Sequence, residues 1–359
     1  MVFRTVCLDD IGLDPERASR RASLSQTLGK FVYNLTLAIP DTPLKANKSQ
    51  VSEMIYDMPN IRTLILIYER EDVQPHTLIH NAVYKLEHLN HITLQEARFD
   101  PRFAKFPRIG VAVSRTFFHR FLTTVLKARS SHIQTLQLNT LLPLDPDLYR
   151  TIRDDAPHLR CVSFTATINP ELRDLFANPT PWASGKTGSL EALTIFKCDG
   201  VDTGSFVRNV LRGTYGTQLK NVKLISSGED IPDIPLASTP VHASIRCLHF
   251  DHSVAWEISA LSHIPIQDLS LTRMRFDAFI ELSIRLTSGP SDSGGMQPGF
   301  KGLKRLRLNP SLESAEAWEG FGDEVKDAYA RLKEVCSQRD IRLSFDAEVL
   351  RNACTSPHI

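Results

Sequence analysis

The chain has 359 residues, and its 42 lysines and arginines against 41 aspartates and glutamates leave a formal net charge of +1. This balance argues against a nucleic-acid partner, which usually requires a strong basic excess. No run of eighteen apolar residues is present, so we expect no membrane span. The six cysteines are scattered without a CxxC pair, unlike those of a disulfide-stabilised secreted domain. We therefore expect a cytoplasmic or nuclear protein.

One short hydrophobic phrase recurs along the chain: an apolar residue, two others, an apolar residue, one other and a last apolar residue. Successive phrases start 21 to 44 residues apart, and most start 26 to 31 residues apart. A recurrence with this pattern and period is typical of leucine-rich repeats. In chain order the phrases are Phe3-Val6-Leu8, Val32-Leu35-Leu37, Ile61-Leu64-Leu66, Leu89-Ile92-Leu94, Ile133-Leu136-Leu138, Leu159-Val162-Phe164, Leu190-Leu193-Ile195, Leu219-Val222-Leu224, Ile245-Leu248-Phe250, Ile266-Leu269-Leu271, Leu303-Leu306-Leu308 and a closing Ile341-Leu343-Phe345.

Apolar residues recur at helical spacing between the phrases, most clearly from Ser114 to Arg129. This alternation predicts an α/β leucine-rich-repeat solenoid, with a curved parallel sheet on its concave face and helices or irregular turns on its convex face. We expect one array of about eleven to twelve irregular repeats over residues 1–359. Residues 288–299 contain four glycines and two prolines and predict a flexible loop. Residues 311–350 predict a C-terminal cap made of a helix and a strand.

The first phrase, Phe3-Val6-Leu8, begins almost at the initiator methionine, with no polar segment ahead of it. An uncovered strand edge promotes association between chains. We therefore expect either a segment upstream of this sequence or a bound partner to cover the first hydrophobic layer.

The pattern of irregular repeats resembles that of fungal F-box/leucine-rich-repeat proteins. In those proteins a strand similar to Phe3-Arg4-Thr5-Val6 directly follows a three-helix F-box. The resemblance implies the substrate receptor of a ubiquitin ligase, in which the repeats hold a target protein and the F-box holds the ligase adaptor. No stretch here looks like an F-box, so the receptor half alone is implied, and an adaptor only if an F-box lies upstream. The family's cysteine-containing repeat is approached by Leu190-Leu193-Ile195, Cys198, Val201, Asp202 and Phe206.

Residues that alternate with the core leucines should point to the concave face of the sheet. Over the first two-thirds of the chain these positions are neutral, mostly Thr, Ser, Asn and Gln. Paired arginines suit carboxylates and phosphates, so the last third predicts docking of an acidic or phosphorylated peptide. The alternative is an ordinary solvated sheet face. The predicted protein-binding residues are Lys223, His249, Asp268, Arg305 and Arg307.

Two patterns suggest ligand chemistry only weakly. Gly185-Lys186-Thr187 echoes a phosphate-binding loop but has Thr180 where a glycine is required, so a flexible loop is favoured. His76 and His80 stand at helical spacing without a third metal ligand, which favours solvated histidines.

Two other patterns suggest regulation. His249, Asp251 and His252 suggest a metal ion or a proton-sensitive contact, with ordinary surface residues as the alternative. Arg20-Arg21-Ala22-Ser23 matches the substrate pattern of basophilic kinases, although a solvated connecting turn is the simpler reading.

The sequence thus predicts a protein-binding module without catalytic residues, cofactor or metal. Its leading function is the substrate-receptor part of an F-box-type ubiquitin-ligase subunit that lacks its F-box. The alternative is a free-standing leucine-rich-repeat scaffold or inhibitor with no link to a ubiquitin ligase. An enzyme or an enzyme activator of repeat architecture is a third class, with less support.

Overall fold

The computed structural model describes residues 5–8, 23–39, 48–68, 77–96, 115–128, 132–139, 151–152, 158–165, 190–198, 219–226, 245–251, 258, 261–262, 264–274, 276–287, 299–310 and 322–345. The chain divides into two compact units. The first comprises Met1–Leu190 and Lys197–Val201, and the second comprises Glu191–Phe196 and Asp202–Ile359. Both units contain parallel β-strands and α-helices, so the α/β class predicted from the sequence is confirmed.

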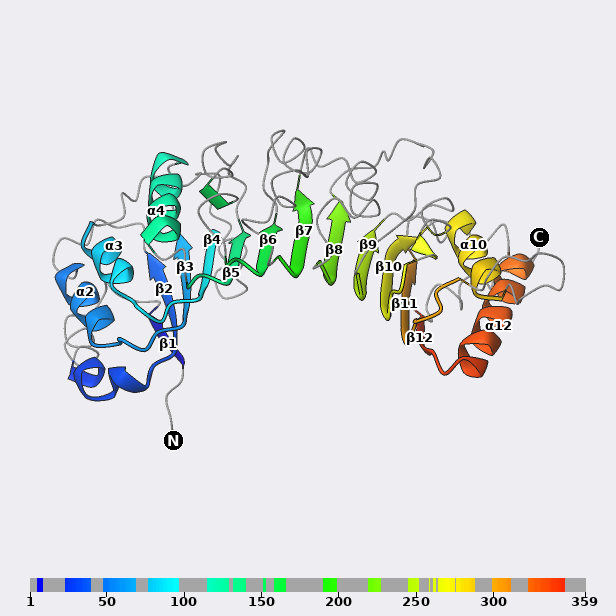
Figure 1. Cartoon of the computed structure of the whole chain (residues 1–359), viewed down its shortest axis with the longest axis horizontal. Helices are drawn as coiled ribbons and strands as arrows, with labels where there is room; N and C mark the ends of the chain where they lie inside the picture. The colour runs from blue at the N-terminus through cyan, green and yellow to red at the C-terminus, as the bar shows by residue number, and fades with distance from the viewer. Residues whose placement is uncertain are drawn as a thin grey trace. The chain divides into compact units, whose positions relative to one another are not determined.

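The strands of the first unit lie side by side in chain order, and all of them are parallel. Tyr84 of α3 stacks on Phe121 of α4 with 6.3 Å between the ring centroids, and Figure 1 shows α2, α3 and α4 next to one another. The elements of this unit are β1 (Thr5–Leu8), a helical segment over 23–28, η1 (Gly29–Phe31), β2 (Asn34–Ile39), α2 (Lys48–Tyr56), β3 (Thr63–Tyr68), α3 (Thr77–Tyr84), β4 (His91–Glu96), α4 (Arg115–Ala128), β5 (Thr135–Asn139) and β6 (Cys161–Thr165).

The strands of the second unit follow the same rule, parallel and in chain order. Figure 1 shows α10 beside α12, where the Ser283 hydroxyl donates to the Ala328 carbonyl across 3.3 Å. The elements of this unit are β7 (Ala192–Cys198, up to Phe196 in this unit), β8 (Asn221–Ser226), β9 (Cys247–Asp251), β10 (Asp268–Met274), α10 (Phe276–Thr287), β11 (Arg305–Pro310), α12 (Gly322–Gln338) and β12 (Arg342–Phe345).

Alternation along each strand places the apolar residues of the recurring phrase in the core. In β5, β6 and β10, buried residues alternate with half-buried ones, as a strand with one covered face requires. Leu35 and Leu37 in the first unit, and Leu269 and Leu271 in the second, are at most 1% exposed. The strand positions that the phrase predicts are therefore confirmed wherever the structure describes them.

One backbone arrangement recurs from strand to strand in both units. The Tyr33 carbonyl, just ahead of β2, accepts hydrogen bonds from two successive N–H groups, those of Arg62 and Thr63, at 2.7 and 3.0 Å. Because both donors stand at the start of the next strand, the arrangement fixes its register against the previous one. Equivalent side chains consequently form straight rows across the strands. Seven other carbonyls also accept hydrogen bonds from two successive N–H groups, those of Arg62, Asn90, Gln134, Glu191, Lys220, Arg246 and Gln267.

The predicted helix from Ser114 to Arg129 is confirmed as α4, with described bounds Arg115–Ala128. Within 311–350 the structure places α12 and β12, and Arg339 after α12 donates to the carbonyls of Leu286, Gly299 and Phe300. That these elements act as a cap stays a prediction. Residues 288–298 of the predicted flexible loop lie outside the described residues.

The sequence predicted a solvated connecting turn from Arg20 to Ser23. The structure differs at Ser23, which lies in the helical segment over 23–28. The Ser25 hydroxyl is buried and donates to Asp57 Oδ2 across 2.8 Å, which ties this segment to the next repeat. Ser23 itself is exposed. Residues 20–22 lie outside the described residues.

Candidate functional site

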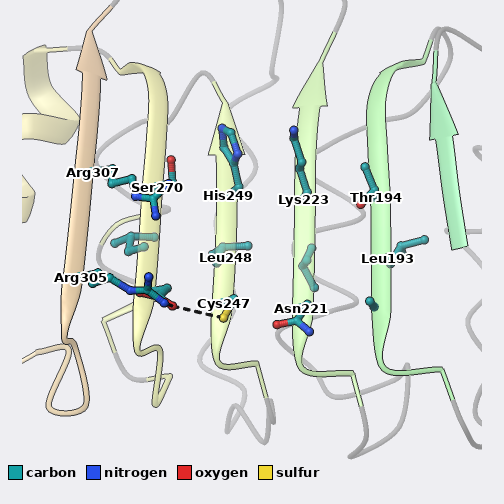
Figure 2. A pocket seen from close by; sticks show the side chains of 14 residues that line it. Leu193, Thr194, Asn221, Lys223, Cys247, Leu248, His249, Ser270, Arg305 and Arg307 are labelled. Atoms are coloured by element: carbon teal, nitrogen blue, oxygen red, sulfur yellow. Dashed lines mark hydrogen bonds and ion pairs between the residues drawn. The ribbon is translucent and has the colours of Figure 1, made fainter. Parts of the chain in front are cut away.

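All five residues predicted to bind a protein line one pocket in the second unit, with a volume of about 330 Å³. The pocket lies on what we call the open face, the side of the strands to which the residues between the buried leucines point. Lys223 comes from β8, His249 from β9, Asp268 from β10, and Arg305 and Arg307 from β11 (Figure 2). The shared register of the strands brings them together, with Lys223 beside His249 and Asp268 beside Arg305.

Two rows of side chains cross the open face of this unit. The aspartate row consists of Asn221, Cys247, Asp268, Arg305 and Arg342, which are register partners on β8 to β12. Two residues further along each strand, the basic row consists of Lys223, His249, Ser270, Arg307 and Ser344.

Asp268 is the acidic centre of the aspartate row, and its neighbours on both sides bond to it. Arg305 donates through Nε and Nη2 to the two carboxylate oxygens, and the Cys247 thiol donates to Oδ2 across 3.6 Å. The hydrogen bond and the charge of Asp268 raise the pKa of Arg305. The carboxylate is thus balanced by a cation within the protein.

The Cys247 thiol is a poor nucleophile in this environment. Its partial burial raises its pKa, and the charge of Asp268 and the hydrogen bond to that carboxylate raise it further. Because thiolate is the reactive form, the raised pKa makes this thiol less reactive.

The basic row contains positive charge without a carboxylate in the row. The Lys223 ammonium lies above the ring of Phe196, 5.3 Å from its centroid, and His249 and Ser270 are half-buried. Arg307 is exposed, and among the described residues it forms no ion pair. Figure 2 shows its side chain extending from β11 toward Ser270 on β10. This row is therefore the anion-attracting part of the pocket.

The two arginines of β11 have different surroundings, and their predicted joint grip on a ligand stays a prediction. Their spacing places Arg305 and Arg307 on the same face, as predicted. The register, however, sets Arg305 beside Asp268 and Arg307 beside Ser270. Asp268 therefore occupies the guanidinium of Arg305.

The open face of the first unit is neutral, as the sequence predicted, but its side chains are bonded to one another. Thr93 donates to Gln137 across 3.1 Å, and Asn139 donates to Gln95 across 3.3 Å. Thr93 has only one hydroxyl proton, so its oxygen accepts from His91 Nε2 at 3.1 Å. These links between strands were missed by sequence reasoning, because the register that creates them is not visible in one strand.

Burial lowers the pKa of His91, and this predicts a pH-dependent stability. Between the lowered pKa of the folded chain and about 6.5, the unfolded chain binds more protons than the folded one. The stabilisation is therefore complete above about pH 6.5 and is lost as the pH falls toward the folded pKa. Urea unfolding between pH 5 and 7.5 should show this slope, and His91→Gln should reduce it. His132→Gln, which leaves His91 in place, should keep the slope; equal slopes in wild type and His91→Gln would contradict the assignment.

Most of the weaker sequence patterns fall outside what the structure describes. Gly185-Lys186-Thr187, His76 and His252 lie outside the described residues, as do the side chains of His80 and Asp251. Within the described part of the chain, no three His, Cys, Asp or Glu side chains are gathered as a metal site requires. None of the described helices is long and apolar enough to cross a membrane.

In comparisons with known proteins, no family model and no curated protein matches this chain.

Proposed function

We propose that this chain is a leucine-rich-repeat receptor that binds a target protein on its open face and performs no covalent chemistry. The observation that carries the proposal is that exposed and half-buried polar side chains form two rows across neighbouring strands. Residues of both rows line the pocket of the second unit. The recurring phrase, the parallel strands in chain order and the repeated carbonyl arrangement support a repeat architecture. Repeat proteins commonly bind macromolecules on such a surface.

The contacts within the pocket favour binding over catalysis. An acid–base site would need a carboxylate to orient His249 and a nucleophile beside it. Asp268 lines this pocket, and its carboxylate is bonded to Arg305 and Cys247. The raised pKa of Cys247 favours its protonated form.

The resemblance to F-box/leucine-rich-repeat proteins leads us to place this receptor in a ubiquitin ligase in the cytoplasm or nucleus. In that role the open face would hold the target, and a separate F-box would hold the adaptor. A free-standing scaffold or inhibitor would use the same face without an adaptor.

A pair of substitutions with the same chemistry tests the proposal. Asn221→Arg adds a long, positively charged side chain to the open face. Gln338→Arg adds the same side chain at an exposed position of α12. Each variant of the full-length protein is used to capture partners from extracts of its own organism, with quantification by mass spectrometry. We expect Asn221→Arg to lose at least one specific partner about fivefold or more, while Gln338→Arg keeps it.

Recovery of the same partners with both variants would overturn the open-face proposal. A ubiquitin-ligase adaptor retained by both variants would support the ligase role, because the adaptor binds elsewhere. A specific partner without any adaptor would favour the scaffold.

A further inference from the structure

We propose that the basic row binds a phosphoserine or phosphothreonine in an extended segment of the target, with an acidic residue about three positions from the phosphorylated one. This inference rests on the proposed function, since it names the chemistry recognised by the same face. The phosphate contacts Arg307, Ser270 and His249, and the acidic residue contacts Lys223.

Three donors from three neighbouring strands define the phosphate position. Arg307, Ser270 and His249 are direct register partners, and Figure 2 shows the Arg307 side chain extending over β10. A guanidinium binds phosphate through two parallel hydrogen bonds, and the Ser270 hydroxyl and the His249 ring add donors from β10 and β9. A phosphate group accepts through three terminal oxygens, whereas a carboxylate has two in one plane. The row therefore suits phosphate better than a simple acidic side chain.

Asp268 lies two residues from Ser270 along β10 and would repel a dianion if its charge were uncompensated. Arg305 and Cys247 both donate to this carboxylate. Arg305 is thus a positioning residue that balances Asp268 and does not touch the ligand. This separation of roles makes Arg305 and Arg307 distinguishable by experiment.

Lys223 lies too far from Arg307 to bind the same phosphate. The two residues are three strands apart, which corresponds to about 14 Å. The Lys223 ammonium lies over the ring of Phe196 on β7. A phosphate centred over Ser270 is two strands, or about 10 Å, from Lys223. An extended chain advances about 3.3–3.6 Å per residue, so a peptide that crosses the strands covers this distance in about three residues.

A nucleic acid fits these observations less well. Its phosphates form a continuous series, and proteins that bind it supply several basic contacts. In the described basic row the two cations are separated by His249 and Ser270, and the whole chain has a formal net charge of only +1. A single phosphorylated residue with one acidic companion needs no more than this.

The test uses the full chain and a degenerate peptide array with a central phosphoserine, in which glutamate is fixed in turn at each position from −6 to +6. Matched arrays carry serine or glutamate at the centre, and labelled oligothymidylate represents nucleic acid. We expect phosphoserine peptides to bind at least tenfold more tightly than both matched arrays. We also expect a further preference for glutamate about three positions away, on one side.

Three variants assign the roles. Arg307→Met should weaken phosphopeptide binding about tenfold or more, and Lys223→Met should remove the preference for the distant glutamate while phosphate recognition remains. Arg331→Met removes an exposed arginine of α12 outside the pocket, and as the matched control it should change phosphopeptide affinity less than threefold. Circular dichroism of each variant confirms that it is folded.

Several results would overturn the inference: equal binding of phosphorylated and unphosphorylated arrays, tighter binding of oligothymidylate, or an equal loss in Arg307→Met and Arg331→Met. Such a failure is distinguishable from failure of the proposed function. The extract is treated with phosphatase before capture. If the unsubstituted chain still captures the target and Asn221→Arg still loses it, the open face binds a protein without recognising phosphate.

Discussion

Replacing Phe279 with alanine should lower the free energy of unfolding of the second unit by about 3–5 kcal/mol. Phe279 of α10 is 0% exposed, and its ring meets the edge of Phe345 on β12 with 5.8 Å between centroids. The substitution removes buried apolar surface, leaves a cavity and breaks an aromatic pair. Urea unfolding measures the total loss, and hydrogen exchange of peptides from α10 and β12 shows whether this unit is the part affected.

The same helix provides the control for this prediction. Ile284 is 49% exposed, so Ile284→Ala removes much less buried surface from the same element. We expect its effect to stay within about 1 kcal/mol. Similar losses for the two variants would mean that α10 is not packed on β12 as the structure places it.

Replacing Gly29 with alanine should destabilise the first unit by about 3 kcal/mol. A Cβ atom at this position would lie 2.1 Å from the carbonyl oxygen of Asp57 and 2.8 Å from its carbonyl carbon. These are backbone atoms of the neighbouring repeat, so the clash is relieved only if two packed segments move apart. The Ser25–Asp57 hydrogen bond spans the same contact and should weaken with it.

Gly302→Ala is the matched control, since the nearest atom to its Cβ would be the Ile266 carbonyl oxygen at 3.6 Å, an ordinary contact. We expect a change within about 1 kcal/mol, measured by urea unfolding beside Gly29→Ala. Hydrogen exchange of peptides covering η1 and the end of α2 should rise in Gly29→Ala only. Equal stability of the two variants would contradict the close approach at Gly29.

The strands could be predicted from sequence because two periodic signals agree at every phrase. Apolar residues at positions such as Leu35 and Leu37 satisfy strand alternation, and their recurrence at a repeat period places successive strands in one sheet. The same alternation identified Lys223, His249, Asp268, Arg305 and Arg307 as residues of one face. That they line a common pocket follows from the shared register.

The pairings within the pocket could not be predicted in this way. Arg305 and Arg307 look alike in the sequence, and the difference between them arises only from what stands beside each on β10. A shift of β11 by two residues would have set Arg307 beside Asp268 without altering the hydrophobic pattern.

Local backbone irregularities were also invisible in the sequence. Arg273 in β10 has a φ of 46°, where the pairing with β11 is irregular, and the buried Phe300 has a φ of 55°. Neither is a residue type that favours the left-handed region. Tertiary packing decides these conformations.

The carbonyls that accept two N–H groups make the spacing of the described strands independent of the length of the connections between them. The connection from β9 to β10 joins phrases that start 21 residues apart, and the connection from β4 to β5 joins phrases that start 44 residues apart. Both strands nevertheless begin with the same pair of hydrogen bonds. An insertion in such a connection would therefore leave the rows of the open face in register.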